Sequence, residues 1–336
     1  MNISVDAGGL CIKQGFGNFT FSDNFIKALI KYDRENKYSL YSFCKKNRNL
    51  KLNDNFKYKL LLPKRFWMKG TLTIEEIKNS KDVFLALNQA LPLFSTSYKI
   101  SFCHGLSYYF YPMYYKRDYI RLTNQLNNMI NRSNIIIVSS VKVKKEIRSI
   151  FPKSPKIKVI PFGIPFEFKE FKERKRKKQF LFCGMNSEIK NLDYIIKSFL
   201  IFISNKKYMD YKLILVGPFQ KQAKISKNIS CKPFLSRRQL IDLYRESMAY
   251  LTASYYESFN FPVLEALSQK CQVIGLKTAI IPELEKYVNT VANKKSFGDK
   301  LIHVANGKKI NINRKELIKD FSWIQFIKEI KKCYLS

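Results

Sequence analysis

The chain of 336 residues contains only two histidines and seven scattered cysteines, and no Cys-x-x-Cys pair. Zinc sites and disulfide-rich secreted folds need such clusters, so the sequence predicts neither. The odd, dispersed cysteines indicate free thiols in a reducing compartment. No apolar run approaches the roughly 18 residues that a membrane-spanning helix needs. The first residues have the pattern of a strand and not of a signal peptide, which predicts a cytoplasmic protein.

Acidic residues are also scarce, since 26 Asp and Glu stand against 61 Lys and Arg, for a formal net charge of +35. The excess is spread evenly, with 28 basic and 10 acidic residues in 1–165 and 33 and 16 in 166–336. Lysine supplies 48 of the 61 positive charges, whereas phosphate recognition favours the planar fork of arginine. The composition therefore predicts no specific nucleic-acid function and favours non-specific attraction to anionic lipid headgroups.

What the sequence does contain is a repeated alternation of strands and helices. With 46% hydrophobic and 15% aromatic residues, the chain can fill two cores of ordinary size. In the first half we expect strands at 3–6, 38–43, 57–63, 99–105, 134–140 and 156–161, and helices at 21–32, 118–130 and 141–151. In the second half we expect strands at 179–184, 211–217, 248–254 and 272–275, and helices at 192–203, 236–245, from about 282, and at 314–335. This pattern predicts an α/β protein with doubly wound parallel sheets.

A boundary between the halves is indicated near residue 165. Gly163-Ile-Pro165 is followed by the charged run Lys172-Glu-Arg-Lys-Arg-Lys-Lys178, which is typical of a solvated linker. The alternation of strands and helices starts again directly after this run. We therefore expect an N-terminal domain at 1–165 and a C-terminal domain from 166 onward.

Two carboxylates form the most informative local feature of the sequence. Glu257 and Glu265 end the run Glu257-Ser-Phe-Asn-Phe-Pro-Val-Leu-Glu265, which follows the expected strand at 248–254. The first carboxylate then lies at the carboxyl end of a strand, where ligands bind in doubly wound sheets. The second lies in the first turns of a helix, whose free N–H groups and positive dipole end suit an anionic ligand.

Further motifs accompany this run in a fixed order along the chain. In the second half they are Phe182-Cys-Gly184, Lys190-Asn-Leu192, Leu215-Val-Gly217-Pro, Pro233-Phe-Leu-Ser236-Arg-Arg-Gln-Leu240, Leu243-Tyr244, Tyr255-Tyr-Glu257-Ser-Phe-Asn-Phe-Pro262-Val-Leu-Glu265-Ala-Leu and Ile281-Pro-Glu283. In the first half they are Val5-Asp-Ala7, Gly15-Phe-Gly17, His104-Gly-Leu-Ser-Tyr108 and Val159-Ile-Pro-Phe-Gly163. The ordered set, over nearly the whole chain, resembles the retaining glycosyltransferases of family 4, which belong to glycosyl transferases group 1.

The resemblance implies a GT-B fold, with two Rossmann-like domains that face each other across a cleft. The N-terminal domain at 1–165 would bind the acceptor, and the C-terminal domain at 166–315 would bind a UDP- or GDP-sugar. A helix at 316–336 would pack back on the N-terminal domain through Phe321 and Trp323. No metal and no cofactor would be needed.

The implied reaction is the transfer of a hexose-type sugar, with retention of configuration, to a glycan or lipid-linked acceptor. Such an enzyme would serve the synthesis of surface polysaccharides or glycoconjugates. A cytoplasmic protein that is peripheral on the inner face of an anionic membrane would suit lipid-linked acceptors.

The resemblance also implies three catalytic residues. Glu257 would bind the transferred sugar or support its developing positive charge, and Lys190 would neutralise the donor diphosphate as it leaves. His104 would approach the donor sugar or the acceptor from the first domain. Each could instead have a structural role: a turn-stabilising carboxylate, a surface lysine and a packed histidine respectively.

Donor binding would centre on Glu265, a charged acceptor for the two ribose hydroxyls. It could instead be a solvent-exposed carboxylate that stabilises the helix dipole. Pro233 and Phe234 would lie near the nucleobase, and Gly15 and Gly17 would let the first loop approach the diphosphate or the acceptor. The remaining donor-binding residues would be Gly184, Ser258, Phe259 and Asn260.

Several positions depart from the family pattern. Ser258 and Asn260 replace two glycines, although Asn tolerates the left-handed conformation better than most residues. Where an arginine usually assists Lys190, this chain has Met185 or Ile189. These departures leave open a catalytically impaired GT-B protein that binds glycans or partners. The high positive charge leaves open an electrostatic binder of polyanions or membranes, and the GT-B fold a sugar-nucleotide epimerase, which the ordered motifs disfavour.

Overall fold

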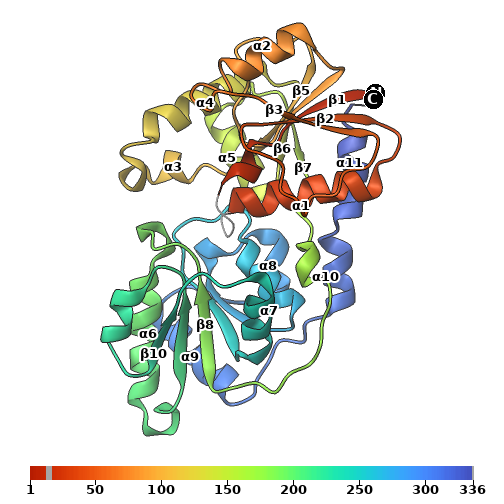
Figure 1. Ribbon diagram of the computed structural model, residues 1–336. Coiled ribbons are helices and arrows are strands. Elements are labelled where there is room, and N and C mark those ends of the chain that lie inside the picture. Colours follow the sequence, from red (N-terminus) through yellow and green to blue (C-terminus); the bar gives the residue numbers. More distant parts are fainter. Residues whose placement is uncertain (13–16, 335–336) are drawn as a thin grey trace. The chain divides into compact units, whose positions relative to one another are not determined.

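The computed structural model describes residues 1–12 and 17–334, which form two compact units (Figure 1). The first unit comprises Met1–Gly163 together with the C-terminal segment that begins at Ser322. The second unit comprises Ile164–Phe321. Each unit is an α/β fold built on one parallel sheet. Gly15, one of the expected donor-binding residues, lies outside the described residues.

The sheet of the first unit has seven strands in the order β3-β2-β1-β4-β5-β6-β7. The chain runs outward from β1 to one edge and returns to the other side of β1, so the order reverses between β1 and β4. The central strands β4 and β6 are buried along their whole length, as expected when helices cover both faces. The strands are β1 (Asn2–Asp6), β2 (Lys37–Ser42), β3 (Phe56–Leu60), β4 (Val83–Ala86), β5 (Tyr98–Cys103), β6 (Ile135–Val138) and β7 (Lys156–Val159).

Six α-helices of the described residues belong to the first unit: α1 (Gly17–Tyr32), α2 (Thr71–Lys78), α3 (Ser107–Phe110), α4 (Tyr119–Arg132), α5 (Val141–Ile150) and α11 (Trp323–Lys331). The last of these lies beside α1 (Figure 1). Its Trp323 and Phe326 join an aromatic cluster with Phe21, and the ring of Trp323 stacks on that of Phe162 with 6.4 Å between centroids. This buried contact attaches α11 to the N-terminal unit.

The expected single helix at 314–335 is wrong in one respect, because the structure has two helices there. The first, α10 (Arg314–Asp320), belongs to the second unit. The chain passes from the second unit back to the first between Phe321 and Ser322, whereas the expected boundary was between residues 315 and 316. Phe321 is buried against Phe259 of the second unit, with ring centroids 6.0 Å apart, whereas Trp323 is buried in the first. Helical periodicity shows which residues are buried but not in which core.

Gly163 is expected to be essential to the packing of α11. A Cβ atom at this position would lie 2.5 Å from both Cγ and Cδ1 of Trp323. We expect Gly163→Ala to lower the free energy of unfolding by about 1–3 kcal/mol, the usual cost of overpacking. Gly298→Ala is the matched control, because a Cβ there meets nothing within 4 Å and alanine favours a helix. Urea unfolding that finds equal effects for both variants would contradict this account.

The sheet of the second unit has six strands in the order β10-β9-β8-β11-β12-β13. They are β8 (Gln179–Cys183), β9 (Lys212–Val216), β10 (Ile229–Lys232), β11 (Ala249–Thr252), β12 (Gln272–Leu276) and β13 (Asn289–Val291). The α-helices are α6 (Leu192–Ser204), α7 (Arg237–Glu246), α8 (Phe261–Ser268), α9 (Lys294–Ala305) and α10. The order reverses between β8 and β11, which makes this pair the topological switch point.

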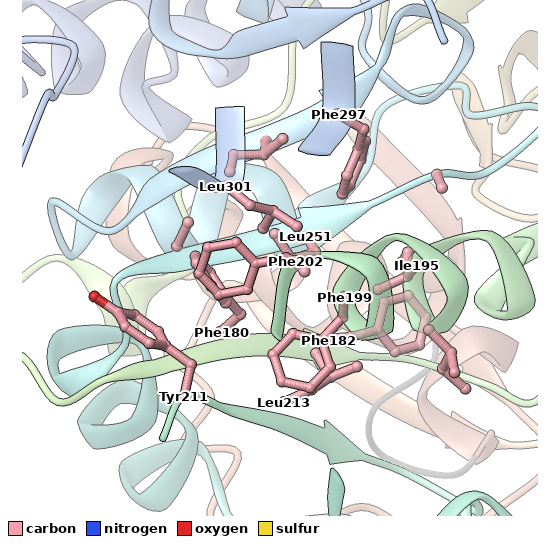
Figure 2. Close-up of a cluster of buried hydrophobic side chains, with 14 of the residues drawn as sticks. Phe180, Phe182, Ile195, Phe199, Phe202, Tyr211, Leu213, Leu251, Phe297 and Leu301 are labelled. Carbon is pink, nitrogen blue, oxygen red and sulfur yellow. The ribbon is translucent and has the colours of Figure 1, made fainter. Parts of the chain in front are cut away.

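The hydrophobic core of the second unit fills the space between the sheet, α6 and α9 (Figure 2). Phe180 and Phe182 from β8 meet Phe199 and Phe202 from α6, and the rings of Phe180 and Phe202 are T-shaped at 5.5 Å. Phe297 and Leu301 close the cluster from α9. These phenylalanine side chains thus pack the helices against one face of the sheet.

The cysteines differ from the expectation that all thiols are free. Cys11 and Cys44 form a disulfide, while Cys103, Cys183, Cys231, Cys271 and Cys333 are free. The bonded pair follows β1 and β2, which are neighbours in the sheet, so their carboxyl ends bring the two cysteines together. An odd number of cysteines and their spacing carry no information about such a neighbourhood.

Candidate active site

The switch point of the second sheet brings two loops together at its carboxyl edge. The loop after β8 runs through Gly184 and a 3₁₀ turn (Glu188–Lys190), and the loop after β11 runs through Ser254 to Glu257. The backbone N–H of Tyr255 donates to the C=O of Ile189 at 2.9 Å, which joins the two loops. In doubly wound sheets this edge is where ligands bind.

Lys190 and Glu257, both expected at the site, form an ion pair there. Lys190 Nζ lies 2.6 Å from Glu257 Oε1, and the Ser254 hydroxyl donates to the same oxygen at 2.7 Å. The side chains are 31% and 12% exposed, so the pair is half-buried but open to solvent. This arrangement holds an ammonium group and a carboxylate at fixed positions beside the end of β11. Lys190 is therefore not an unattached surface lysine.

Glu265 forms a second ion pair with Arg237, the first residue of α7. Arg237 Nη1 donates to Glu265 Oε1 at 2.8 Å, and the Tyr244 hydroxyl donates to Oε2 at 3.3 Å. Burial raises the pKa of Glu265, and Arg237 and Tyr244 oppose that rise. At 2% exposure Glu265 does not fit the role of a solvent-exposed helix carboxylate.

The charges of the two ion pairs shift the pKa values of the same buried side chains. Burial and, to a smaller extent, Glu265 raise the pKa of the Cys183 thiol at the end of β8 to about 12, while Arg237 and Lys190 oppose the rise. Burial also raises the pKa of Tyr250, and both Glu257 and Glu265 add to that shift. We call Lys190, Glu257, Arg237 and Glu265 the two-pair cluster.

The turn between the two carboxylates has the geometry that its asparagine allows. Asn260 has φ of 69°, in the left-handed region where a glycine would otherwise be favoured. Its Nδ2 donates to Thr252 Oγ1 at 3.3 Å and to the Ala279 C=O at 3.1 Å, which fixes the start of α8. Phe259 is buried between Phe261 and Phe321, and Ser258 is half-buried.

The other donor-binding candidates of this unit lie at the same edge of the sheet but on different strands. Gly184 directly follows β8, and its C=O is approached so closely by Gly217 that a Cβ on Gly217 would lie 2.2 Å away. Pro233 and Phe234 follow β10 and are exposed. The short loop that holds Pro233 and Phe234 joins β10 to α7, whose first residue, Arg237, belongs to the two-pair cluster.

Gly17 and His104 belong to the first unit. Gly17 begins α1, is exposed, and has open space where a Cβ would lie, so packing does not require glycine there. His104 follows β5, and its Nε2 lies 2.5 Å from the Leu87 C=O. A carbonyl can only accept, so Nε2 carries the proton and Nδ1 is the acceptor. The ring packs edge-on to Phe21 at 4.8 Å.

The residues that the structure describes contain no group of three His, Cys, Asp or Glu placed to hold a metal ion. No helix within residues 1–12 and 17–334 combines the length and apolar character that crossing a bilayer requires. A cavity of about 370 Å³ in the second unit is lined by Arg174, Arg176, Arg245, Lys270 and Lys309 among others. Arg176 donates there to the C=O of Tyr244 in the last turn of α7 and to the C=O of Ser247 directly after it, so at least this cation caps a helix end.

Residues 163–334 match the family model described as glycosyl transferases group 1. The chain belongs to this family. It is a glycosyltransferase, as the ordered motifs predicted, and the match covers both ion pairs of the two-pair cluster. A search of curated proteins finds no match to the chain.

Solved structures of similar fold extend over nearly the whole of this glycosyltransferase. Sucrose-phosphate synthase from Thermosynechococcus elongatus is 14% identical over 99% of this chain and 98% of its own, with a TM-score of 0.76. An E. coli protein described as trehalose-6-phosphate bound with UDP-2-fluoro glucose is 10% identical over 98% and 99%, with a TM-score of 0.70. The lipopolysaccharide outer core galactosyltransferase WaaB is 14% identical over 99% and 99%, with a TM-score of 0.62. These likenesses confirm the GT-B fold with two Rossmann-like domains.

Two functional candidates of this glycosyltransferase were not found from the sequence. Arg237 lies 28 positions before Glu265, inside the motif Pro233-Phe-Leu-Ser236-Arg-Arg-Gln-Leu240, but nothing in that motif indicates that the two residues pair. Asp6 ends β1 at the switch point of the first sheet, where it accepts from the Gly8 N–H at 2.9 Å and from Asn88 Nδ2 at 3.1 Å. Burial raises the pKa of Asp6 to about 6.

The stability of this glycosyltransferase is expected to fall in mild acid because of His104. Burial lowers the pKa of His104 to about 4, against an ordinary value of 6.5. The unfolded chain therefore binds a proton at a pH where the folded chain does not, and the free energy of unfolding decreases as pH falls from 6.5 towards 4. The loss attributable to His104 should reach about 3 kcal/mol at the low end. Urea unfolding at about pH 7 and about pH 4.5, on either side of most of this titration, measures it.

His104→Gln removes this titration and should flatten the pH dependence relative to the parent chain. Comparison with the parent cancels Asp6, whose raised pKa acts in the opposite direction over the same range. His303→Gln is the matched control, because His303 is exposed on α9. Equal pH slopes for the parent and His104→Gln would contradict the assigned burial.

Proposed function

We propose that this glycosyltransferase moves a hexose-type sugar from a UDP- or GDP-sugar to a glycan or lipid-linked acceptor, with retention of configuration. The observation that carries the proposal is the two-pair cluster at the switch point of the second sheet. The E. coli neighbour is described as bound with UDP-2-fluoro glucose, and WaaB is described as a galactosyltransferase of the lipopolysaccharide outer core. Both support the donor class and a role in surface polysaccharide or glycoconjugate synthesis.

Lys190 and Arg237 would neutralise the donor diphosphate. Both lower the pKa of the Cys183 thiol, so both positive charges act at the end of β8. Charge that is already in place when the phosphate leaves stabilises the transition state more than the bound donor. Arg237 thus offers the second cation that Met185 and Ile189 cannot supply. With two fixed cations for the diphosphate, we propose that neither a metal nor a cofactor takes part.

The two carboxylates would take different parts of the donor. Glu265 accepts one hydrogen bond on each oxygen, from Arg237 and Tyr244, and a carboxylate has about four acceptor positions. The remaining capacity suits the vicinal hydroxyls of ribose. Glu257 lies eight residues earlier beside Lys190, where it would contact the transferred sugar and support positive charge at the anomeric carbon.

The acceptor would be held by the first unit, where His104 keeps a neutral ring at pH 7 because burial lowers its pKa to about 4. Its Nδ1 can accept a hydrogen bond from a sugar or acceptor hydroxyl, because Nε2 is held by Leu87. We place the enzyme in the cytoplasm, at the inner membrane face, which would suit a lipid-linked acceptor.

A thermal-shift screen against UDP, GDP, ADP and their sugars tests the donor class. A ligand present at about 100 times its Kd stabilises a protein by about 2.7 kcal/mol. Either UDP and its sugars or GDP and its sugars should therefore raise Tm by several degrees. Donor hydrolysis should then be measured for the parent and for Glu257→Gln. If nucleotide raises Tm but neither protein hydrolyses the donor, the result would favour a catalytically impaired binding protein over an enzyme. If no nucleotide raises Tm, the proposed UDP- or GDP-sugar donor is wrong.

A further inference from the structure

A group of exposed large apolar side chains of the first unit lies around α2. Six of them are between 53% and 69% exposed, although they are of the types that normally fill a core. They come from three segments of the chain: the loop after β3, the outer side of α2, and the loop after β4. We call them the α2 face: Leu62, Phe66, Ile74, Ile77, Leu93 and Phe94.

Hydrogen bonds join the three segments into one surface. The Gly70 N–H donates to the Phe66 C=O at 2.6 Å, which ties the loop after β3 to the start of α2. The Leu93 N–H donates to Thr73 Oγ1 at 2.8 Å, which ties the loop after β4 to the same turn. Ile74 and Ile77 are three residues apart and therefore lie on one side of the helix.

Phe66 is held outward by the backbone. It has φ of 58°, which is rare for a bulky side chain, and it is 69% exposed. The next residue, Trp67, is buried against Phe43 with ring centroids 5.4 Å apart, so it anchors the loop. The fold thus buries one aromatic residue and presents its neighbour to solvent. Strained backbone of this kind is typical of functional positions.

Exposed cations prevail around the α2 face. Between residues 57 and 81 the exposed charged side chains are all basic: Lys57, Lys59, Lys64, Arg65, Lys69 and Lys78. The exposed carboxylates of Asp54 and Asp82 lie outside this stretch. The two acidic residues of this stretch, Glu75 and Glu76, are 8% and 0% exposed. Lys59 pairs with Glu75 at 2.6 Å, and Ser95 Oγ donates to Glu76 at 2.7 Å, so both carboxylates are turned into the unit.

We propose that the α2 face binds the surface of an anionic lipid bilayer. Leu62, Phe66 and their apolar neighbours would enter the level of the headgroups and upper acyl chains, while Lys64 and Arg65 stay among the anionic headgroups. Apolar burial and attraction to anionic lipid act together at such a surface. A rim in which exposed cations prevail, and in which Glu75 and Glu76 are buried, suits a bilayer better than a protein, whose interface carries both signs. The inference rests on the proposed function and deepens it by naming how the enzyme reaches a lipid-linked acceptor.

Co-sedimentation of the full chain with vesicles tests the proposal without any donor. The parent should bind vesicles of equal phosphatidylcholine and phosphatidylglycerol, and bind pure phosphatidylcholine at least tenfold more weakly. Leu62→Ser with Phe66→Ser should lower the partition coefficient for the anionic vesicles at least tenfold. The matched control is Ile201→Ser with Met209→Ser, which removes two apolar side chains that are 66% and 60% exposed in the second unit; it should bind as the parent does.

A second variant, Lys64→Gln with Arg65→Gln, should weaken binding severalfold and reduce its dependence on salt. All these residues are exposed, so thermal unfolding and the nucleotide-induced shift should match the parent, which separates this test from that of the donor site. Equal vesicle binding by the parent and Leu62→Ser with Phe66→Ser would overturn the proposal, since charge alone or another surface would then suffice. Equal binding to both vesicle compositions would overturn it as well.

Discussion

Replacing Lys190 by methionine is expected to lower kcat/KM for donor hydrolysis and sugar transfer by about 10²–10³-fold, the usual effect of removing one preorganised group that stabilises developing charge. Lys190 Nζ is held 2.6 Å from Glu257 Oε1. On the proposed function the same ammonium meets the departing diphosphate. Methionine keeps most of the length of the side chain and removes the ammonium group, with its charge and its hydrogen bond to Glu257. Steady-state kinetics with the nucleotide-sugar chosen by the thermal-shift screen measures the effect.

Two further variants, Lys190→Arg and Lys197→Met, test whether the loss of activity is due to the charge at position 190. Arginine restores the charge but not the geometry of the ammonium group, so part of the activity should return. Lys197 is exposed on α6, and its replacement should leave the kinetics unchanged. Glu257→Gln should reduce kcat by a comparable factor, because the partner of Lys190 then carries no charge. If Lys190→Met retains activity within threefold of the parent, the catalytic assignment of Lys190 is wrong.

Glu265→Ala is expected to erase the nucleotide-induced rise in Tm and to destabilise the free protein. The carboxylate is 2% exposed and lies 2.8 Å from Arg237. The substitution therefore removes the carboxylate that pairs with a largely buried guanidinium. Breaking a buried pair from one side costs about 3–5 kcal/mol, and the 28% exposure of Arg237 places the expected value near the lower end of that range. Thermal unfolding with and without UDP or GDP measures both effects.

Two further variants separate binding from stability. Glu265→Gln keeps the shape and an acceptor for Tyr244, so it should lose less stability while still losing most of the nucleotide shift. Glu188→Ala is the control, because Glu188 is exposed on the 3₁₀ turn that leads to Lys190 and should change neither quantity. A full nucleotide shift in Glu265→Ala, measured from its own lowered Tm, would remove Glu265 from the donor site.

Much of the fold could be predicted because strands and helices leave local patterns. The strand at 248–254 corresponds to β11, and the carboxylate that follows it lies at the predicted edge of the sheet. Strands β4, β10 and β13 and helices α2, α3 and α9 were not predicted, and the α-helix expected from about residue 282 was wrong, because Pro282–Tyr287 forms a 3₁₀ helix. Each of these strands has only three or four residues, which is too short for a periodic pattern to emerge.

The asparagine of the carboxylate turn shows where local chemistry suffices. Its tolerance of the left-handed conformation is a property of the single residue, and Asn260 does adopt φ of 69°. The break at Phe321 shows the opposite case. Phe321 and Trp323 are both large, aromatic and buried, so nothing local indicates that the first packs on Phe259 and the second on Phe162.

By itself the sequence determined the family, the alternation of elements and the end of the strand that carries Glu257, because these depend on residue type and on spacing along the chain. The tertiary structure alone decided that Arg237 neutralises Glu265, that Cys11 meets Cys44, and that three apolar loop and helix segments form the α2 face. These contacts join residues that lie 28, 33 and 20 positions apart in sequence through the packing of separate elements. Such contacts depend on which strands and helices become neighbours, and spacing along a single chain does not specify that.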